Sequence, residues 1–333
     1  MSLPDPSLII DLAVTYRWSM VLFAASDLDV FTMLAGGPRT AAEIAAACGA
    51  HERPLEIVLN ACVAQQLLAR DGQRYRNTPI ADAYLVRGRR AYIGDGLKYA
   101  EDLYPAWGRL LELVRTNRPV VEAEEMLGGD QERTRHFVLG MHNRALGIAA
   151  ALPSGVDLTG RRRLLDVGGG PGTYSILLAK ATPGLQATVM DLPGVLEISR
   201  EIIASYGMGD RVSTQPGDYL AAEFPAGHDV VLLSGMMHRE TPETCRRLLR
   251  KAFGALDPGG LVVVSDVFFE SATKDSPAFA THFALNMMLT SEHGSTHAKT
   301  EMREWMQQAG FTSVSVKDLP PPNPHSLVIG SRP

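Results

Sequence analysis

The sequence predicts an α/β protein in which a Rossmann-like domain follows a mostly helical, winged-helix-like domain. Three observations predict this fold. A short apolar strand enters a glycine-rich turn over residues 163–172. After that turn, apolar strands alternate with amphipathic helices, which is the pattern of a mostly parallel sheet. Before the turn, apolar residues recur at helical spacing and are interrupted by one Asp-Gly hairpin turn.

The first ninety or so residues indicate helices and a hairpin. Thr40 and Glu43 have the spacing of a capping box and begin one helix. A second helix is expected over 51–66, and a hairpin follows over 68–75. Two helices and a hairpin make a winged helix, which we place at residues 1–95.

A winged helix also raises the alternative of a DNA-binding regulator. A major-groove helix should be basic, but the helix over 51–66 is apolar and acidic apart from one arginine. Residues 1–90 contain nine Lys or Arg and nine Asp or Glu, and the whole chain has a net charge of −5. The charge therefore does not favour a nucleic-acid partner.

The remaining elements follow in order. Residues 96–155 are expected to form a helical connector that contributes to a substrate pocket, and Pro153-Ser154-Gly155 ends it. Residues 156–333 form the second domain, in which the helix after the glycine turn covers 173–180. Another helix begins at Thr241-Pro242 and ends before residue 257. Beyond the strand that enters the glycine turn, strands are expected at 187–190, 211–215, 230–233, 261–265, 312–317 and 327–331.

The glycine turn predicts a bound nucleotide-like cofactor. Asp166 precedes it, and Gly168 and Gly170 allow a ligand to approach the backbone beside the amino terminus of the next helix. The dinucleotide pattern needs a third glycine at position 173, where this chain has Thr173. The pattern present, G-x-G-x-G, instead resembles the turn of S-adenosylmethionine (SAM) methyltransferases.

Polar residues at later strand ends extend this predicted site. Asp191 follows the second strand, where Rossmann-like units place the carboxylate that binds the ribose hydroxyls. The third strand is followed by Gly-Asp-Tyr. The complete predicted cofactor site consists of Asp166, Gly168, Gly170, Asp191, Leu192, Gly217, Asp218, Tyr219 and Ser234.

Several motifs occur in a fixed order: Leu-Asp-Val-Gly-Gly-Gly-Pro-Gly, Met-Asp-Leu-Pro-Gly-Val, Gly-Asp-Tyr, Met-Met-His-Arg-Glu and Asp-Pro-Gly-Gly. With them the chain resembles the plant-type (class II) small-molecule O-methyltransferases, whose bacterial members include acetylserotonin- and hydroxyneurosporene-methyltransferase-like enzymes. The resemblance covers nearly the whole chain. It implies a seven-stranded SAM-binding domain, a homodimer formed through the N-terminal domain, and an enzyme of secondary metabolism. The substrate is expected to be a small, aromatic or polyketide-like molecule with a hydroxyl group.

The resemblance also implies the catalytic residues. His238 matches the general base, Asp266 matches an acid that orients it, and Asp218 matches the residue that binds the adenine amino group. Histidine can accept a phenolic proton at neutral pH when it is positioned for this. The chain departs from the family at Thr296, where a second acid is expected, and at Arg239-Glu240 after the base. Glu292, His293 and His297 lie near the missing acid, and the substrate contacts are expected to be Met141, His142, Phe283, Asn286 and Met287.

These departures leave an alternative open. The protein would then be a family member that binds SAM but hydroxylates or decarboxylates its substrate. No segment is expected to span a membrane, the first residues lack the basic region of a signal peptide, and a cytoplasmic location is expected. Cys48, Cys62 and Cys245 lie too far apart to indicate a disulfide framework or a zinc site, so no metal is expected.

Overall fold

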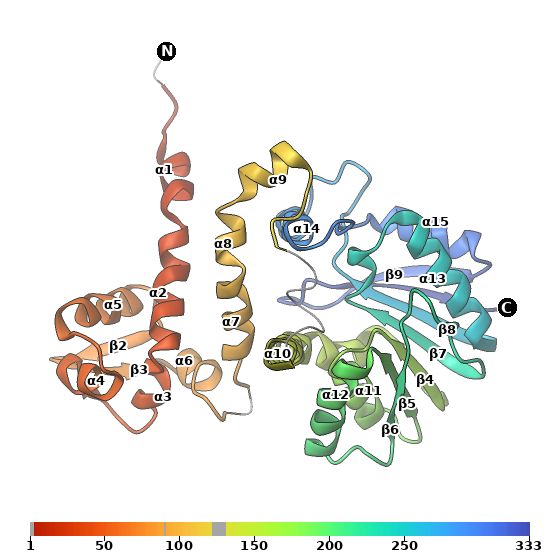
Figure 1. The fold of residues 1–333 in the computed structure, drawn as a ribbon, viewed down its shortest axis with the longest axis horizontal. Helices are drawn as coiled ribbons and strands as arrows, with labels where there is room; N and C mark the ends of the chain where they lie inside the picture. The colour runs from red at the N-terminus through yellow and green to blue at the C-terminus, as the bar shows by residue number, and fades with distance from the viewer. Residues whose placement is uncertain (1–2, 90, 122–130) are drawn as a thin grey trace. The chain divides into compact units, whose positions relative to one another are not determined.

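The computed structural model describes residues 3–89, 91–121 and 131–333. Met1–Asp102 and Leu103–Pro333 form two compact units, which are described separately (Figure 1). The predicted fold class, a helical N-terminal domain and a seven-stranded α/β domain, is confirmed.

The first unit combines helices with a three-stranded sheet of order β1-β3-β2. Thr40 and Glu43 form the predicted capping box at the start of α4. Phe31, Ile44 and Tyr75 are fully buried and join the helices to the sheet. The elements are α1 Ser7–Val14, α2 Tyr16–Asp27, α3 Val30–Leu34, β1 Arg39–Thr40, α4 Ala41–Cys48, α5 Glu52–Ala64, β2 Leu68–Asp71, β3 Arg74–Asn77, α6 Pro79–Tyr84 and α7 Gly94–Asp102.

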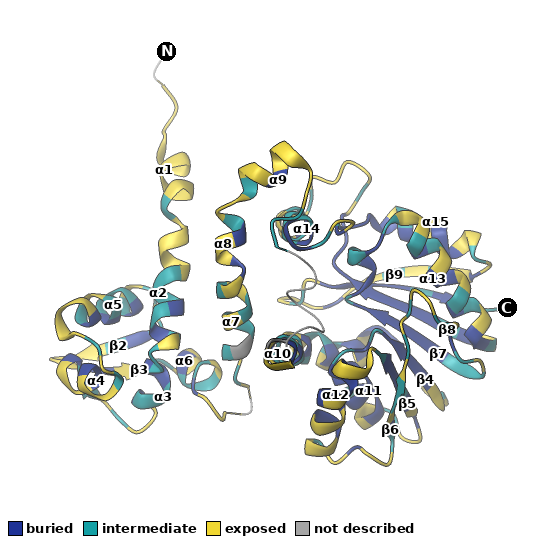
Figure 2. Ribbon diagram, viewed as in Figure 1, coloured by how far each residue is buried: buried dark blue, intermediate teal, exposed yellow. Residues whose placement is uncertain are grey.

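Helices α1 and α2 correct one expectation. They form a helical stretch of 21 residues, Ser7–Asp27, that is long and apolar enough to cross a membrane by length and composition. The sequence analysis expected no segment of that length; Asp11, Arg17 and Asp27 lie within this stretch. Only 11% of its most apolar window is buried (Figure 2). This apolar surface therefore lacks cover within the described part of the chain.

The second unit holds a seven-stranded sheet of order β6-β5-β4-β7-β8-β10-β9. The first five strands in this order are parallel, whereas β10 is antiparallel to both β8 and β9. The strands are β4 Arg163–Val167, β5 Gln186–Asp191, β6 Val212–Pro216, β7 His228–Ser234, β8 Leu256–Asp266, β9 Thr312–Asp318 and β10 Ser326–Ser331. All seven predicted strands are present, and their bounds differ by a few residues from the predicted ones.

Helices cover both faces of this sheet, because successive strand residues point to opposite sides. Leu164 belongs to the core that lies beneath α10, α11 and α12, and Leu165 belongs to the core beneath α13 and α15. The central strands β4 and β7 are mostly buried between the two layers, whereas the edge strands β6 and β9 are largely exposed or half-buried (Figure 2). The helices are α8 Tyr104–Trp107, α9 Leu110–Thr116, α10 Gln131–Gly155, α11 Thr173–Ala181, α12 Pro193–Ser205, α13 Pro242–Ala255, α14 Ala278–Thr290 and α15 Lys299–Gln308, with a 3-10 turn over Met237–Arg239.

The compact units divide after Asp102, whereas the sequence predicted boundaries at 95 and 155. Helix α10 accounts for the difference. Its residues Val138, Ala149 and Leu152 are buried in the core between this helix and the sheet. Much of the predicted connector therefore shares the core of the sheet, and the functional division into three parts stays a prediction.

Candidate active site

The predicted site residues gather at one edge of the sheet, where the parallel strands end. Asp166 lies in β4, Asp191 ends β5 and Ser234 ends β7. Asp191 pairs with Pro216 at the end of β6, and Ser234 pairs with Ser265 in β8. Ligands of open α/β sheets bind at the carboxyl ends of the strands. The fold therefore brings residues from distant parts of the chain to the edge where a ligand is expected.

The glycine turn forms one wall of this edge. Gly168 and Gly170 have φ angles of 62° and 51°, in the left-handed region that favours glycine. A Cβ at Gly169 would lie 2.7 Å from Cγ of Asp166, so this turn packs directly on that carboxyl group. A Cβ at Gly170 would meet no atom within 4 Å, which leaves this backbone open to a ligand.

Asp166 is fully buried beneath the turn. Its Oδ2 accepts a hydrogen bond of 2.8 Å from the hydroxyl of Ser175. Its Oδ1 has no partner among the described residues. Burial raises the pKa of Asp166 to about 7, although the Ser175 hydrogen bond acts in the opposite direction. A buried acceptor without a donor is costly, so this atom is available to a donor on a bound molecule.

Asp191 is held by the backbone around the turn. Oδ2 accepts the N–H of Gly170 at 2.8 Å, and Oδ1 accepts the N–H of Leu192 at 2.7 Å. Burial raises the pKa of Asp191, opposed by these two N–H groups and by the charge of Arg239. An ionised carboxylate has about four acceptor sites, so two remain for ribose hydroxyls. Leu192 beside it is 42% exposed and offers an apolar contact.

The segment after β6 forms the opposite wall. A Cβ at Gly168 would lie 3.5 Å from the ring of Tyr219, so this ring lies beside the glycine turn. The Tyr219 hydroxyl donates to Oε1 of buried Glu240 at 2.8 Å. Burial, followed by the charge of Glu240, raises the pKa of Tyr219. The ring is therefore fixed as a flat, neutral surface.

Asp218 lies on the exposed side of the same segment. Its Oδ1 accepts the N–H of Leu220 at 2.8 Å, and the N–H of Gly217 donates to the carbonyl of Asp191 at 3.0 Å. Lys251 donates to the carbonyls of Tyr219, Leu220 and Ala222 and so holds this turn. The position fits an adenine contact at the rim, which stays a prediction.

The residues present fit a nucleoside cofactor. One buried acceptor, Oδ1 of Asp166, has no hydrogen-bond partner among the described residues. Asp191 has acceptor sites left, the backbone at Gly170 is open, and Tyr219 and Leu192 offer apolar surface. These carboxylate acceptors suit the hydroxyl and ammonium groups of a nucleoside cofactor better than a pyrophosphate, which needs hydrogen-bond donors.

His238 and Asp266 lie next to this cradle and form a close pair. His238 Nδ1 is 2.7 Å from Oδ1 of Asp266, and the His238 backbone N–H donates to Oδ2 at 3.2 Å. Burial acts to raise the pKa of Asp266, but His238 and the N–H of Val267 outweigh it, so the pKa lies below its usual value. The ionised carboxylate accepts the Nδ1 proton, which leaves Nε2 of His238 as the acceptor. Nε2 has no hydrogen-bond partner among the described residues.

His325 is a second imidazole beside Asp266 that the sequence did not reveal. It is 7% exposed, and its Nδ1 lies 3.0 Å from Oγ of Ser265. Burial lowers its pKa to about 4, opposed by Asp266 and assisted by His238 and Arg144. His325 follows a proline-rich loop without periodicity. Only the pairing of Ser326 with Asp266, between β10 and β8, brings it to the site.

Helix α14 contributes an aromatic wall. The ring of Phe283 meets that of His238 edge to face, with centroids 4.8 Å apart, and is stacked with Phe279 at 6.1 Å. Of the other predicted substrate contacts on this helix, Asn286 accepts the indole N–H of Trp107 at 3.0 Å. Met287 is buried, and a Cβ at Gly294 would lie 2.6 Å from its carbonyl oxygen. Phe283 is therefore the predicted substrate contact that the structure places beside His238.

The two candidates on α10 lie elsewhere. His142 Nδ1 is 2.7 Å from Oγ1 of Thr173, and Nε2 is 3.3 Å from the hydroxyl of Tyr206. Its ring joins α10 to α11 and α12, next to the glycine turn. Met141 is half-buried on the same helix. A substrate role for either residue stays a prediction.

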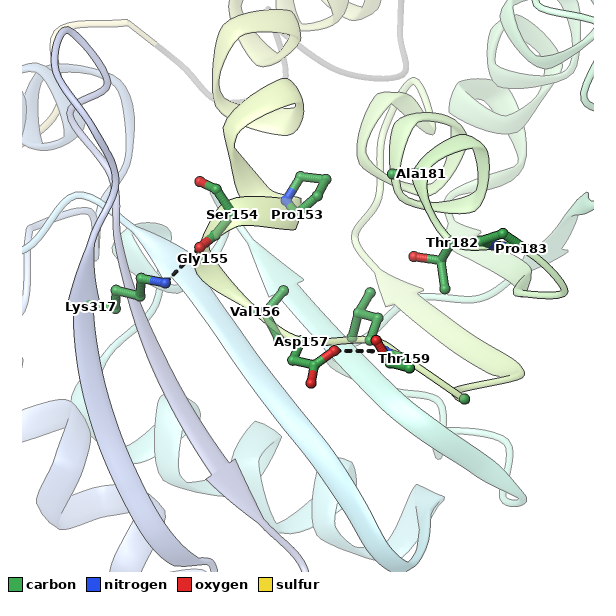
Figure 3. Close-up of a pocket in the computed structure, with 12 residues that line it drawn as sticks. Pro153, Ser154, Gly155, Val156, Asp157, Thr159, Ala181, Thr182, Pro183 and Lys317 are labelled. Atoms are coloured by element: carbon green, nitrogen blue, oxygen red, sulfur yellow. Dashed lines mark hydrogen bonds between the residues drawn. The ribbon is translucent and has the colours of Figure 1, made fainter.

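Among the described residues, no group of three or more His, Cys, Asp or Glu side chains could hold a metal ion. A depression of about 640 Å³ lies at the other edge of the sheet, lined by residues 153–160, 181–183 and Lys317 (Figure 3). It contains none of the predicted site residues. Lys317 there donates to the carbonyl of Ser154 at 2.5 Å, which joins β9 to the end of α10.

Comparisons with known proteins agree with this architecture. Residues 119–312 match the O-methyltransferase domain, and residues 10–87 match the O-methyltransferase dimerisation domain. The chain is 35% identical to the 3-hydroxy-5-methyl-1-naphthoate 3-O-methyltransferase of Streptomyces sahachiroi, over 98% of this chain and 95% of that protein. It is 33% identical to the tetracenomycin polyketide synthesis 8-O-methyl transferase of Streptomyces glaucescens, over 98% of this chain and 97% of that protein.

A solved structure shares the fold at full length. Human N-acetylserotonin methyltransferase, determined in complex with SAM, superposes with a TM-score of 0.89 at 25% identity and covers 100% of this chain and 99% of its own. Other Streptomyces relatives include an N,N-dimethyltransferase and an L-tyrosine C(3)-methyltransferase. The atom that receives the methyl group therefore varies among the relatives.

Proposed function

Because the chain belongs to the O-methyltransferase family, whose members transfer methyl groups from SAM to small molecules, we propose that it methylates a hydroxyl of an aromatic, polyketide-like molecule. In this proposal His238 is the general base and Asp266 orients it. When bound, SAM supplies an electrophilic methyl carbon on its sulfonium.

One observation carries the proposal: the His238–Asp266 pair. The carboxylate holds the Nδ1 proton at 2.7 Å, so that Nε2 of His238 is left to accept a proton from a hydroxyl. Asp266 also stabilises the imidazolium that this transfer creates, because its charge lies against the ring. A hydroxyl that loses its proton as it approaches the methyl carbon is a better nucleophile, and alignment of the two reactants lowers the barrier further.

Three features support an aromatic substrate. Phe283 contacts the ring of His238, and Phe279 stacks on Phe283 with the two rings inclined by 12°. Aromatic surfaces favour offset-stacked or edge-to-face contacts with flat ligands. The two curated relatives named above act, by their names, on a naphthoate and in tetracenomycin polyketide synthesis. Phenols, with a pKa of about 10, are within reach of a positioned histidine.

We further propose how the cofactor is held and how the protein assembles. Asp191 binds the ribose hydroxyls, Leu192 and Tyr219 contact the adenine ring, and Asp218 binds its amino group at the rim. The protein forms a homodimer through its dimerisation domain, in the cytoplasm. Leu8 and Leu12 on α1 are 70% and 68% exposed, and a partner subunit would cover this apolar surface.

The test is methyl transfer from SAM labelled in its methyl group to a panel of hydroxylated naphthalenes and naphthoates. We expect label in an ether product and a loss of kcat of about 10²-fold to 10⁴-fold in His238→Gln. His293→Gln is the matched control, because His293 is exposed in the loop after α14. Label on a ring carbon would contradict O-methylation, and unchanged kcat in His238→Gln would contradict the assignment of the base. A product formed without label would support the hydroxylating or decarboxylating alternative.

A further inference from the structure

The loop between α14 and α15 is packed against the segment that carries His238. Its backbone N–H at Ser295 donates to the carbonyl of His238 at 2.8 Å. The side chain of His297 extends this contact, because its Nε2 lies 3.1 Å from the carbonyl of Met237 and 3.2 Å from that of Glu240. The 3-10 turn around His238 is therefore held from one side at three carbonyl groups.

The same loop is also attached to the segment that follows Asp266. The N–H of Phe269 donates to the carbonyl of His297 at 3.0 Å, and the N–H of Lys299 donates to the carbonyl of Phe269 at 3.0 Å. Phe269 lies three residues after Asp266 and forms a parallel bridge with Ala298. One short segment thus contacts the backbone on both sides of the His238–Asp266 pair.

The protonation state of the His297 ring, and the nitrogen that carries its proton, follow from its surroundings. It is 5% exposed, and burial lowers its pKa, opposed by the Met237 carbonyl and by the charge of Asp266. Carbonyl oxygens only accept hydrogen bonds, so Nε2 of this neutral ring must carry the proton. Cys245 Sγ lies 3.4 Å from Nε2, and Trp305 meets the ring edge to face at 4.9 Å. The donor is therefore fixed in direction by the packing around it.

The neighbouring residue explains why such a contact matters. Thr296 occupies the place where a second acid was expected, and it brings no charge to the base. It is fully buried, and its hydroxyl has no partner among the described residues. Alignment of His238 on Asp266 therefore depends on neutral contacts around the base, and His297 supplies a side-chain donor among them.

We propose that His297 is a positioning residue for the reaction: its Nε2–H holds the Met237–Glu240 turn so that the His238 ring stays on Asp266. The inference rests on the proposed role of His238 as the base. A displacement of a reacting group by about 1 Å can cost about 100-fold in rate. Loss of the donor should therefore lower kcat, while the cofactor cradle and the affinity for substrate change little.

Two substitutions at His297 distinguish the effect of its N–H donor from the effect of its aromatic ring. His297→Phe keeps an aromatic ring against Trp305 and removes the N–H, whereas His297→Gln keeps an N–H donor. His293→Phe is the control, since it changes an exposed histidine of the same loop. We expect kcat to fall by about 10-fold to 100-fold in His297→Phe, with KM and the SAM dissociation constant within about 2-fold. In His297→Gln, kcat should stay within about 3-fold of the unaltered protein, because an altered hydrogen bond costs less than a lost one.

A second readout needs neither cofactor nor substrate. In protein labelled with ¹⁵N-histidine, the Nδ1–H of His238, bonded to Asp266, should give a low-field proton signal that His297→Phe weakens or moves and that His297→Gln and His293→Phe retain. An unchanged signal together with unchanged kcat in His297→Phe would overturn the inference, and so would an equal loss in the Phe and Gln variants. If His297→Phe does not fold, His297→Asn, which is too short to reach both carbonyls, takes its place. If the unaltered protein methylates no hydroxyl, the proposed function fails, but the His238 signal still decides whether His297 holds the turn.

Discussion

Replacement of His325 by asparagine should change how stability depends on pH. The His325 ring is buried and bonded through Nδ1 to Ser265 Oγ at 3.0 Å, and burial lowers its pKa to about 4. Asparagine keeps a polar atom near the position of Nδ1 and cannot titrate. The comparison therefore isolates the cost of protonating this one ring.

The sign follows from proton linkage. In the unfolded chain a histidine has a pKa of about 6.5, so between pH 6.5 and 4 the unfolded state binds a proton that the folded state does not. The free energy of unfolding therefore falls as the pH drops through this window. Each unit between the two pKa values of His325 is worth about 1.4 kcal/mol, so the whole window amounts to about 3 kcal/mol. About 2 kcal/mol of it is lost between pH 7.5 and 5.

The assay is urea unfolding of both proteins at several pH values and one protein concentration, since dimerisation makes stability depend on concentration. Asp166, whose pKa burial raises to about 7, titrates with the opposite sign in an overlapping window. It is present in both proteins, so its contribution cancels in the difference. We expect His325→Asn to gain about 2 kcal/mol relative to the unaltered protein between pH 7.5 and 5. A difference that stays constant over this range would refute the reasoning.

Three further predictions concern the cofactor cradle and the dimer. Asp191→Ala should weaken SAM binding by at least about 10-fold in a calorimetric titration, since two charge-assisted hydrogen bonds are lost, and unaltered affinity would exclude Asp191 from the site. Glu240→Gln keeps an acceptor for Tyr219 and should leave SAM affinity within about 3-fold, whereas Glu240→Leu should weaken it by about 5-fold to 10-fold; equal effects would argue against the role of that hydrogen bond. Replacing Leu8 and Leu12 by glutamate should yield monomers in sedimentation equilibrium, and a persistent dimer would place the interface elsewhere.

Most of the fold was predictable because its signals are local. The strands of the sheet appear in the sequence as short apolar runs. The glycine turn needs positive φ angles at positions 168 and 170, and the sequence has glycine at both, Gly168 and Gly170. The winged helix followed from one capping box and one hairpin turn. The apolar helical stretch at Ser7–Asp27 was missed, because its charges mask its length in a search for uninterrupted apolar residues.

The parts of the site that escaped prediction depend on contacts between distant segments. His325 reaches Ser265 only because β10 is antiparallel to β8 and pairs Ser326 with Asp266. Glu240 appeared in the sequence as a departure after the base, and its use as the acceptor for Tyr219 required the fold. No spacing rule relates residues 21 or 60 positions apart, so side-chain pairs of this kind are visible only in three dimensions.

Three histidines lie near Asp266, but its carboxylate interacts with a proton on only one of them, the proposed base. His297 and His325 both interact with its charge, yet burial lowers the pKa of each, so that neither competes for a proton at neutral pH. The negative charge of Asp266 is thus left to His238, which it meets at 2.7 Å. Because Thr296 adds no second charge, Asp266 is the carboxylate that contacts an imidazolium at His238. Such a site favours hydroxyls that are already acidic, and this is a physical reason to begin the substrate search with phenols rather than with aliphatic alcohols.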